Sequence, residues 1–79
     1  MMNYNKFMEA MQHPDIKQAY NLFRKKISRF DLIDMYALSG FNGIADCDVY
    51  IKYKDCASSN IIRVFNYQDG KYSIENFQN

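Results

Sequence analysis

The sequence predicts an α+β fold in which two to three N-terminal helices pack on one face of a three-stranded antiparallel β-meander. Apolar residues recur at helical spacing through the first half of the chain, and from Asp46 onward their period changes to two. The Asp69-Gly70 pair near the C-terminus indicates a hairpin turn. We expect a single domain over 1–79, with a helical part at about 3–39 and the meander at about 46–77.

Two short helices are expected first. The helix at 3–12 can be capped by Asn3 or Asn5, and it ends at His13-Pro14 because the residue before a proline avoids the α conformation. Pro14 then begins the second helix, where its missing N–H is not needed. The apolar positions of this second helix are Ile16, Ala19, Tyr20, Phe23 and Ile27.

A third helix is predicted over 28–39. Ser28-Arg29-Phe30-Asp31 has the form of a capping box with Asp in place of Glu, and the residues up to Leu38 are apolar on most sides. Basic residues precede Ser28 and acidic residues follow it, which is the wrong order within one helix and favours a break there. One long bent helix is the alternative, because the apolar stripe continues from Phe23 to Ala37.

Three strands are predicted in the second half of the chain. In the first, Cys47, Val49, Ile51 and Tyr53 alternate with more polar residues. The second covers 61–67 and the third 71–77, after the polar loop at 55–60 and the turn at 68–70. The order of the segments favours a meander.

The Asp69-Gly70 turn allows two registers between the last two strands. A two-residue type I′ turn pairs Tyr67 with Tyr72 and Phe65 with Ile74, and it places all four on the core side. A three-residue loop with a bulge at Gly70 shifts the pairing by one residue, which exchanges the two faces. In that second register the core side consists of Ile62, Val64, Tyr72 and Ile74, and the outer side of Ile61, Arg63, Phe65, Tyr67, Lys71 and Phe77.

The middle strand is apolar on both sides in either register. Phe65 and Tyr67 lie on one side, and Ile62 and Val64 lie on the other. A sheet covered by helices on one face is expected to be polar on its free face, so we expect something to cover the second face. A second copy of the chain, another protein or stacked bases would do so. The alternative is that the N-terminal helix passes to the far side of the sheet.

Composition and charge limit the function classes. The formal net charge is +1, which provides no polybasic tail and no acidic mimic of DNA. The N-terminal residues lack the apolar run of a signal peptide, and no stretch reaches the roughly 18 apolar residues of a membrane helix. We therefore expect a cytoplasmic protein, in its own cell or in a host, with no membrane partner.

No disulfide, metal site or cofactor is expected. Cys47 and Cys56 flank a predicted strand, so their Cα atoms lie too far apart for a disulfide. His13 is the only histidine, and two distant thiols do not form a zinc ligand set. The acidic residues Asp46, Asp48 and Asp55 are interpreted as solvated charges rather than as a cation site. Self-association is then the remaining way to stabilise a domain this small.

Catalysis is not expected. The sequence contains no nucleophile–base set, no glycine-rich phosphate loop and no C-x-x-C motif. Capping and solubility explain the carboxylates, and His13 beside Pro14 is interpreted as a helix cap. A chain of 79 residues also leaves little room for a concave site.

Two groups of residues are candidates for binding a partner. Cations interleaved with aromatic residues are typical both of protein hot spots and of surfaces that stack single-stranded bases. The first group consists of Tyr50, Lys52, Lys54, Arg63, Phe65, Tyr67 and Lys71. The second, a short basic cluster suited to a phosphate or an acidic partner, consists of Arg24, Lys25, Lys26 and Arg29, although complementing a helix dipole explains it equally well.

These features together favour a small non-enzymatic protein-binding module. We expect an inhibitor or modulator that binds a larger intracellular protein or complex, with a homodimer as one form of the partner. Phage-encoded effectors that act against host defence, including anti-CRISPR proteins, are similar in size and composition. This similarity is an analogy of type and not a family resemblance. The alternative is a nucleic-acid-binding accessory protein that uses a basic and aromatic sheet face.

Overall fold

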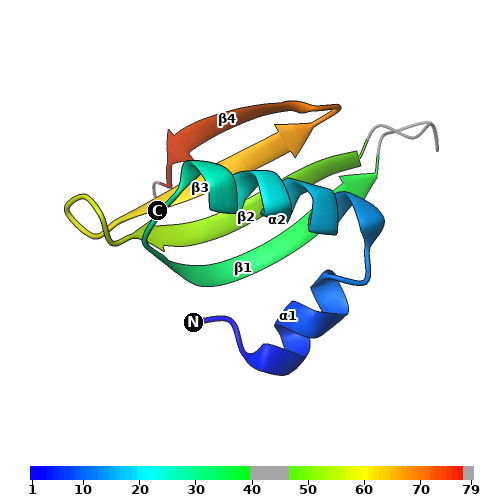
Figure 1. Ribbon diagram of the computed structural model, residues 1–79, viewed down its shortest axis with the longest axis horizontal. Coiled ribbons are helices and arrows are strands. Elements are labelled where there is room, and N and C mark those ends of the chain that lie inside the picture. The colour runs from blue at the N-terminus through cyan, green and yellow to red at the C-terminus, as the bar shows by residue number, and fades with distance from the viewer. Residues whose placement is uncertain (40–46, 78–79) are drawn as a thin grey trace.

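The computed structural model describes residues 1–39 and 47–77. Within these ranges the chain forms α1 (Tyr4–Ala10), α2 (Pro14–Lys26), β1 (Phe30–Ser39), β2 (Cys47–Asp55), β3 (Ile61–Gln68) and β4 (Lys71–Asn76). The strands form one antiparallel sheet in the order β1-β2-β3-β4. α2 crosses in front of the sheet and α1 lies beside β1 (Figure 1). The predicted α+β class with an antiparallel meander is confirmed.

Both helices begin where their capping residues indicate. The Asn3 side chain accepts a hydrogen bond of 2.8 Å from the backbone N–H of Lys6, which caps α1. His13 caps α2 in the same way, because its Nδ1 accepts a hydrogen bond of 3.2 Å from the backbone N–H of Asp15. The predicted role of His13 as a helix cap is therefore confirmed.

The predicted third helix over 28–39 is wrong, because this segment forms strand β1. α2 ends at Lys26 and the backbone of Ile27 is already extended, which confirms the break near Ser28 and excludes the single long helix. The sheet therefore has four strands rather than three. Asp46, at which the meander is predicted to begin, lies outside the described residues.

A bulge explains why β1 resembles a helix in sequence. Leu32 pairs with Tyr53 and Asp34 pairs with Lys52, so Ile33 is an extra residue in β1. Before the bulge, the even-numbered residues Phe30 and Leu32 face α2. After the bulge, the odd-numbered residue Met35 faces α2. A bulge hides the period of two that marks a strand, and the remaining apolar pattern suits a helix as well.

The type I′ turn sets the register of the last hairpin. Asp69 and Gly70 both have positive φ, of 49° and 80°, and Gln68 pairs with Lys71. Tyr67 therefore pairs with Tyr72 and Phe65 pairs with Ile74, which confirms the first of the two predicted registers.

The core lies between α2 and the face of the sheet that it covers. Its buried residues are Ile16, Ala19, Phe23, Met35, Val49, Ile51, Tyr53, Phe65 and Tyr67. The Phe23 ring makes edge contacts with three rings of the sheet, at centroid distances of 4.6 Å to Phe30, 4.8 Å to Tyr53 and 5.4 Å to Phe65.

The N-terminal helix stays on the same side as α2, so the alternative in which it passes to the far side is wrong. Phe7 of α1 contacts Tyr20 of α2 edge to face at 5.2 Å, and Ala10 and Met11 pack against the core. The opposite face of the sheet has no helix over it in the described part of the chain (Figure 1). Neither α1 nor α2 is long and apolar enough to cross a membrane.

We expect Phe23→Ala to lower the free energy of unfolding by about 3–5 kcal/mol, because it leaves a cavity among three aromatic rings. Urea unfolding followed by circular dichroism measures the change. Tyr4→Ala is the aromatic control, since Tyr4 is 73% exposed and its loss should change the value by less than about 0.5 kcal/mol. Equal losses in the two variants would contradict this description of the core.

Candidate functional site

The candidate site is the face of the sheet opposite α2, which we call the outer face. Residues on it alternate with the core residues along each strand. Their cross-strand partners follow from the register: Tyr36 beside Tyr50 and Asn66, Asp34 beside Lys52 and Val64, and Asp31 beside Lys54 and Ile62. Leu38, Asp48, Lys71, Ser73 and Glu75 complete this face, together with Phe77 just after β4.

The outer face exposes large apolar side chains. Tyr36 is 43% exposed, Leu38 54%, Ile62 37% and Phe77 39%. Tyr36 and Tyr50 stack on neighbouring strands, with ring centroids 5.2 Å apart and planes 18° from parallel. Ile62 and Phe77 are neighbours at the other end of the sheet, where the Phe77 N–H donates to the Ile62 carbonyl at 2.9 Å.

The charges of the outer face are arranged as opposite neighbours. Lys52 is in register with Asp34, and Lys54 is in register with Asp31. The Lys52 ammonium lies 3.7 Å from the centroid of the Phe77 ring, a cation–π contact that joins β2 to the end of the chain across β3. Two of the lysines of this face, Lys52 and Lys54, therefore have acidic neighbours, so the face carries charges of both signs beside its apolar side chains.

The structure divides the first predicted group of binding residues between two faces. Tyr50, Lys52, Lys54 and Lys71 lie on the outer face. Phe65 and Tyr67 are buried in the core under α2. Arg63 is also on the α2 side, where it pairs with Tyr53 across the strands and its Nε lies 3.5 Å from Asp55 Oδ2.

The buried corner around Arg63 leaves polar atoms without a hydrogen bond. Arg63 Nε forms an ion pair with the Asp55 carboxylate but no hydrogen bond with any described residue. The Tyr53 hydroxyl also has no hydrogen-bond partner among the described residues. Burial raises the pKa of the Tyr53 hydroxyl, and the nearby Asp55 carboxylate adds to this rise while Arg63 opposes it. The phenol therefore stays neutral.

The basic cluster is separate from the outer face. Arg24, Lys25 and Lys26 are exposed in the last turn of α2, and Arg29 is exposed just after it. The Lys26 ammonium lies 5.7 Å from the centroid of the Tyr72 ring, on the α2 side of the sheet. These cations also stand where they complement the helix dipole.

Sequence reasoning missed the contribution of β1 to the site. Tyr36 and Leu38 were assigned to a helix, so their place on an open sheet face was not foreseen. The four residues after the bulge, Met35 to Leu38, are all apolar, so the sequence shows no alternation there that would mark a strand with one open face.

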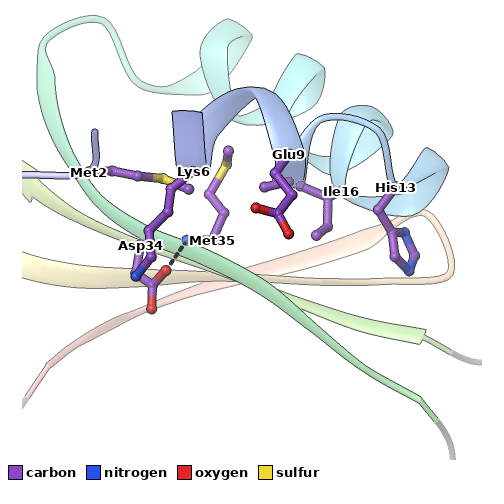
Figure 2. Close-up of a pocket in the computed structure, with 8 residues that line it drawn as sticks. Met2, Lys6, Glu9, His13, Ile16, Asp34 and Met35 are labelled. Carbon is purple, nitrogen blue, oxygen red and sulfur yellow. Dashed lines mark hydrogen bonds between the residues drawn. The ribbon is translucent and has the colours of Figure 1, made fainter. Parts of the chain in front are cut away.

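A hollow between α1 and β1 is a second feature that the sequence did not predict. It has a volume of about 330 Å³, at the lower limit of ligand pockets. Figure 2 shows Lys6, Glu9 and Asp34 around it, so the rim carries both signs of charge. Asp34 Oδ1 accepts a hydrogen bond of 2.9 Å from the Met35 N–H, which holds this carboxylate at the edge of the hollow. Met2, Ala10, Ile16 and Met35 line the rest with apolar atoms.

His13, Asp15 and Cys47 are described residues that could hold a metal ion, since their ligand atoms all lie within 4.8 Å of one another. In the structure, these side chains make contacts with the protein itself. His13 Nδ1 accepts the hydrogen bond that caps α2, so a metal on that nitrogen would remove the cap. Burial raises the pKa of the Cys47 thiol, and the Asp15 carboxylate raises it further by its charge and by a hydrogen bond. Burial and the Asp15 carboxylate therefore both favour the protonated form of the Cys47 thiol.

Comparisons with protein-family models, with curated proteins and with solved structures found no match for this chain.

We expect Asp15→Asn to lower the pKa of the Cys47 thiol, because it removes the negative charge beside it. In a Cys56→Ser background, the rate of alkylation by iodoacetamide as a function of pH reports this pKa. Its midpoint should move to lower pH. Asp31→Asn is the matched control, because Asp31 is at the other end of β1 and should leave the midpoint unchanged. An unchanged midpoint in Asp15→Asn would contradict the contact between the two side chains.

Proposed function

We propose that this chain is a non-enzymatic protein-binding module and that the outer face contacts the partner. The observation that carries the proposal is the exposure of Tyr36, Leu38, Ile62 and Phe77, between 37% and 54%, on a face that no described helix covers. The module would act as an inhibitor or modulator by occupying a surface of a larger intracellular protein.

The energetic argument rests on apolar area. Removing apolar surface from water contributes roughly 25 cal/mol per Å², so a face that leaves such side chains in solvent gains free energy when a partner covers it. The free face of a sheet covered on one side is ordinarily polar, and this one is not. Stacked Tyr36 and Tyr50 add a pre-formed aromatic surface, of the residue type enriched at the centres of interfaces.

The charge pattern supports a protein partner over a nucleic acid. A surface that binds phosphates collects unopposed cations, whereas Lys52 and Lys54 each have an aspartate in register on β1. Matched charges of both signs around apolar side chains suit a protein surface, where they fix orientation and exclude wrong partners.

We expect Leu38→Lys and Ile62→Lys each to weaken partner binding by about 30-fold or more, because a charge in a desolvated interface removes at least about 2 kcal/mol. The tagged intact chain is used to recover proteins from the native lysate, and mass spectrometry identifies those that wild type retains. The purified candidate is then titrated with each variant by calorimetry.

Met8→Lys is the matched control, since Met8 is 45% exposed on α1, away from the outer face. It should bind like wild type. A partner that is lost with Met8→Lys and retained with the two outer-face variants would refute the proposed surface.

Salt dependence separates the protein partner from a nucleic acid. Binding through apolar anchors should change little between 50 and 200 mM salt, whereas neutralising several phosphates would reduce the affinity by orders of magnitude. Steep loss of binding with salt, together with nucleic acid in the recovered material, would overturn the proposal in favour of the nucleic-acid alternative.

A further inference from the structure

We infer that β4 pairs antiparallel with β4 of a second copy of this chain, about a two-fold axis at Ser73, so that the two sheets become continuous. This inference uses the edge of the sheet and is independent of the outer-face proposal. Four features of β4 support it: its open edge, its regular backbone, its self-complementary side chains and its position beyond the cover of α2.

Among the described residues, none bonds to the backbone on the outer edge of β4. β4 is the last strand of the sheet and all its residues are exposed. Gln68 and Lys71 flank the type I′ turn as a hydrogen-bonded pair, and Phe77 also donates to β3, so the odd-numbered residues bond to β3. The N–H and C=O groups of Tyr72 and Ile74 therefore point away from the sheet, free to bond a further strand.

The opposite edge of the sheet is interrupted by a further backbone hydrogen bond and by a bulge, and β4 has neither. At β1 the Met2 N–H donates to the Leu32 carbonyl at 2.9 Å, and a bulge follows at Leu32/Asp34. The pairing of β4 with β3 has no register shift, and β4 contains no proline. An edge with a regular ladder of this kind can accept a partner strand.

The sequence of β4 selects a second copy of itself as that strand. When Ser73 lies opposite the partner's Ser73, Lys71 lies opposite Glu75 and Tyr72 lies opposite Ile74, in both directions. Opposite charges then meet on the outer face, and aromatic and β-branched side chains meet on the α2 side; both are stabilising cross-strand pairs. Moving the axis to Tyr72 or Ile74 removes the pairing of Lys71 with Glu75.

The same pairing covers the apolar residues that α2 leaves open. Tyr72 is 43% exposed and Ile74 37%, on the side of the sheet where α2 lies. The Tyr72 ring stacks on buried Phe65, with centroids 5.0 Å apart and planes 11° from parallel, so it is fixed in place before pairing. In the dimer, Tyr72 and Ile74 of both copies form one cluster over the junction of the two sheets.

A charge exchange tests this arrangement. Lys71→Glu places like charges opposite each other at two symmetric positions, and so does Glu75→Lys. We expect each single variant to raise the dissociation constant of the dimer at least about tenfold, and the double variant Lys71→Glu/Glu75→Lys to restore it. Sedimentation equilibrium at increasing protein concentration measures it, against a monomer mass of 9.4 kDa. Both side chains are exposed, so folding should be unaffected, and circular dichroism checks this.

Wild type that stays monomeric at millimolar concentration would overturn the inference. A dimer that the charge variants leave unchanged and Ile62→Lys dissociates would overturn it too, because the contact would then be the outer face.

Amide hydrogen exchange gives a second, residue-specific test. The N–H groups of Tyr72 and Ile74 should exchange fast in dilute protein and slow at high concentration, because they bond only in the dimer. Those of Ser73 and Glu75 bond to β3 and should be protected at both concentrations. Equal protection of all four residues at both concentrations would contradict the pairing.

Discussion

Phe23 of α2 contacts Phe30, Tyr53 and Phe65, which belong to β1, β2 and β3. This one side chain fixes where the helix lies on the sheet. A helix is about 10 Å wide and strands are about 4.8 Å apart, so one helix covers roughly two strands. α2 therefore buries the middle of the sheet, and although Lys26 reaches the Tyr72 ring, Tyr72 and Ile74 of β4 stay exposed. The open surfaces of the domain follow from this limit.

The two helices contribute unequally to the hydrophobic core. α2 supplies the buried residues Ile16, Ala19 and Phe23, whereas α1 has none and packs through half-buried side chains such as Phe7. α1 and the N-terminal residues lie on the β1 side, where the Met2 N–H reaches the Leu32 carbonyl. The helical layer is thus displaced toward β1, and the opposite edge is left with exposed Tyr72 and Ile74.

The sequence predicted the elements whose signals are local. His13-Pro14 marks the start of α2, alternation marks β2, and Asp69-Gly70 marks the last turn. The strand β1 was predicted as a helix because the bulge at Ile33 interrupts its alternation. The register of the hairpin was left open, because both sides of β3 are apolar and only the backbone at the turn decides between them. The observed register goes with Phe65 and Tyr67 in the core. Tyr50 and Lys52 lie on the outer face because they alternate with the buried Val49, Ile51 and Tyr53 of β2.

The self-complementarity of 71–75 is visible in the sequence, but its meaning depends on the fold. Only when β4 is known to be an edge strand do Lys71 and Glu75 become candidates for pairing across a two-fold axis. Tyr72 is exposed on the α2 side because α2 does not extend far enough over the sheet to bury it. No local pattern in the sequence predicts how far the helix extends.

The exposed apolar residues of the sheet fall into two sets that a single contact cannot cover. Tyr72 and Ile74 are on the α2 side at the β4 edge, whereas Tyr36, Leu38 and Ile62 are on the outer face. Edge pairing would bury the first set and leave the second in solvent, while extending the outer face into one surface across both copies. A symmetric dimer of this kind would present two outer faces on the same side of a continuous sheet, so a partner that contacts both copies would gain from their fixed spacing.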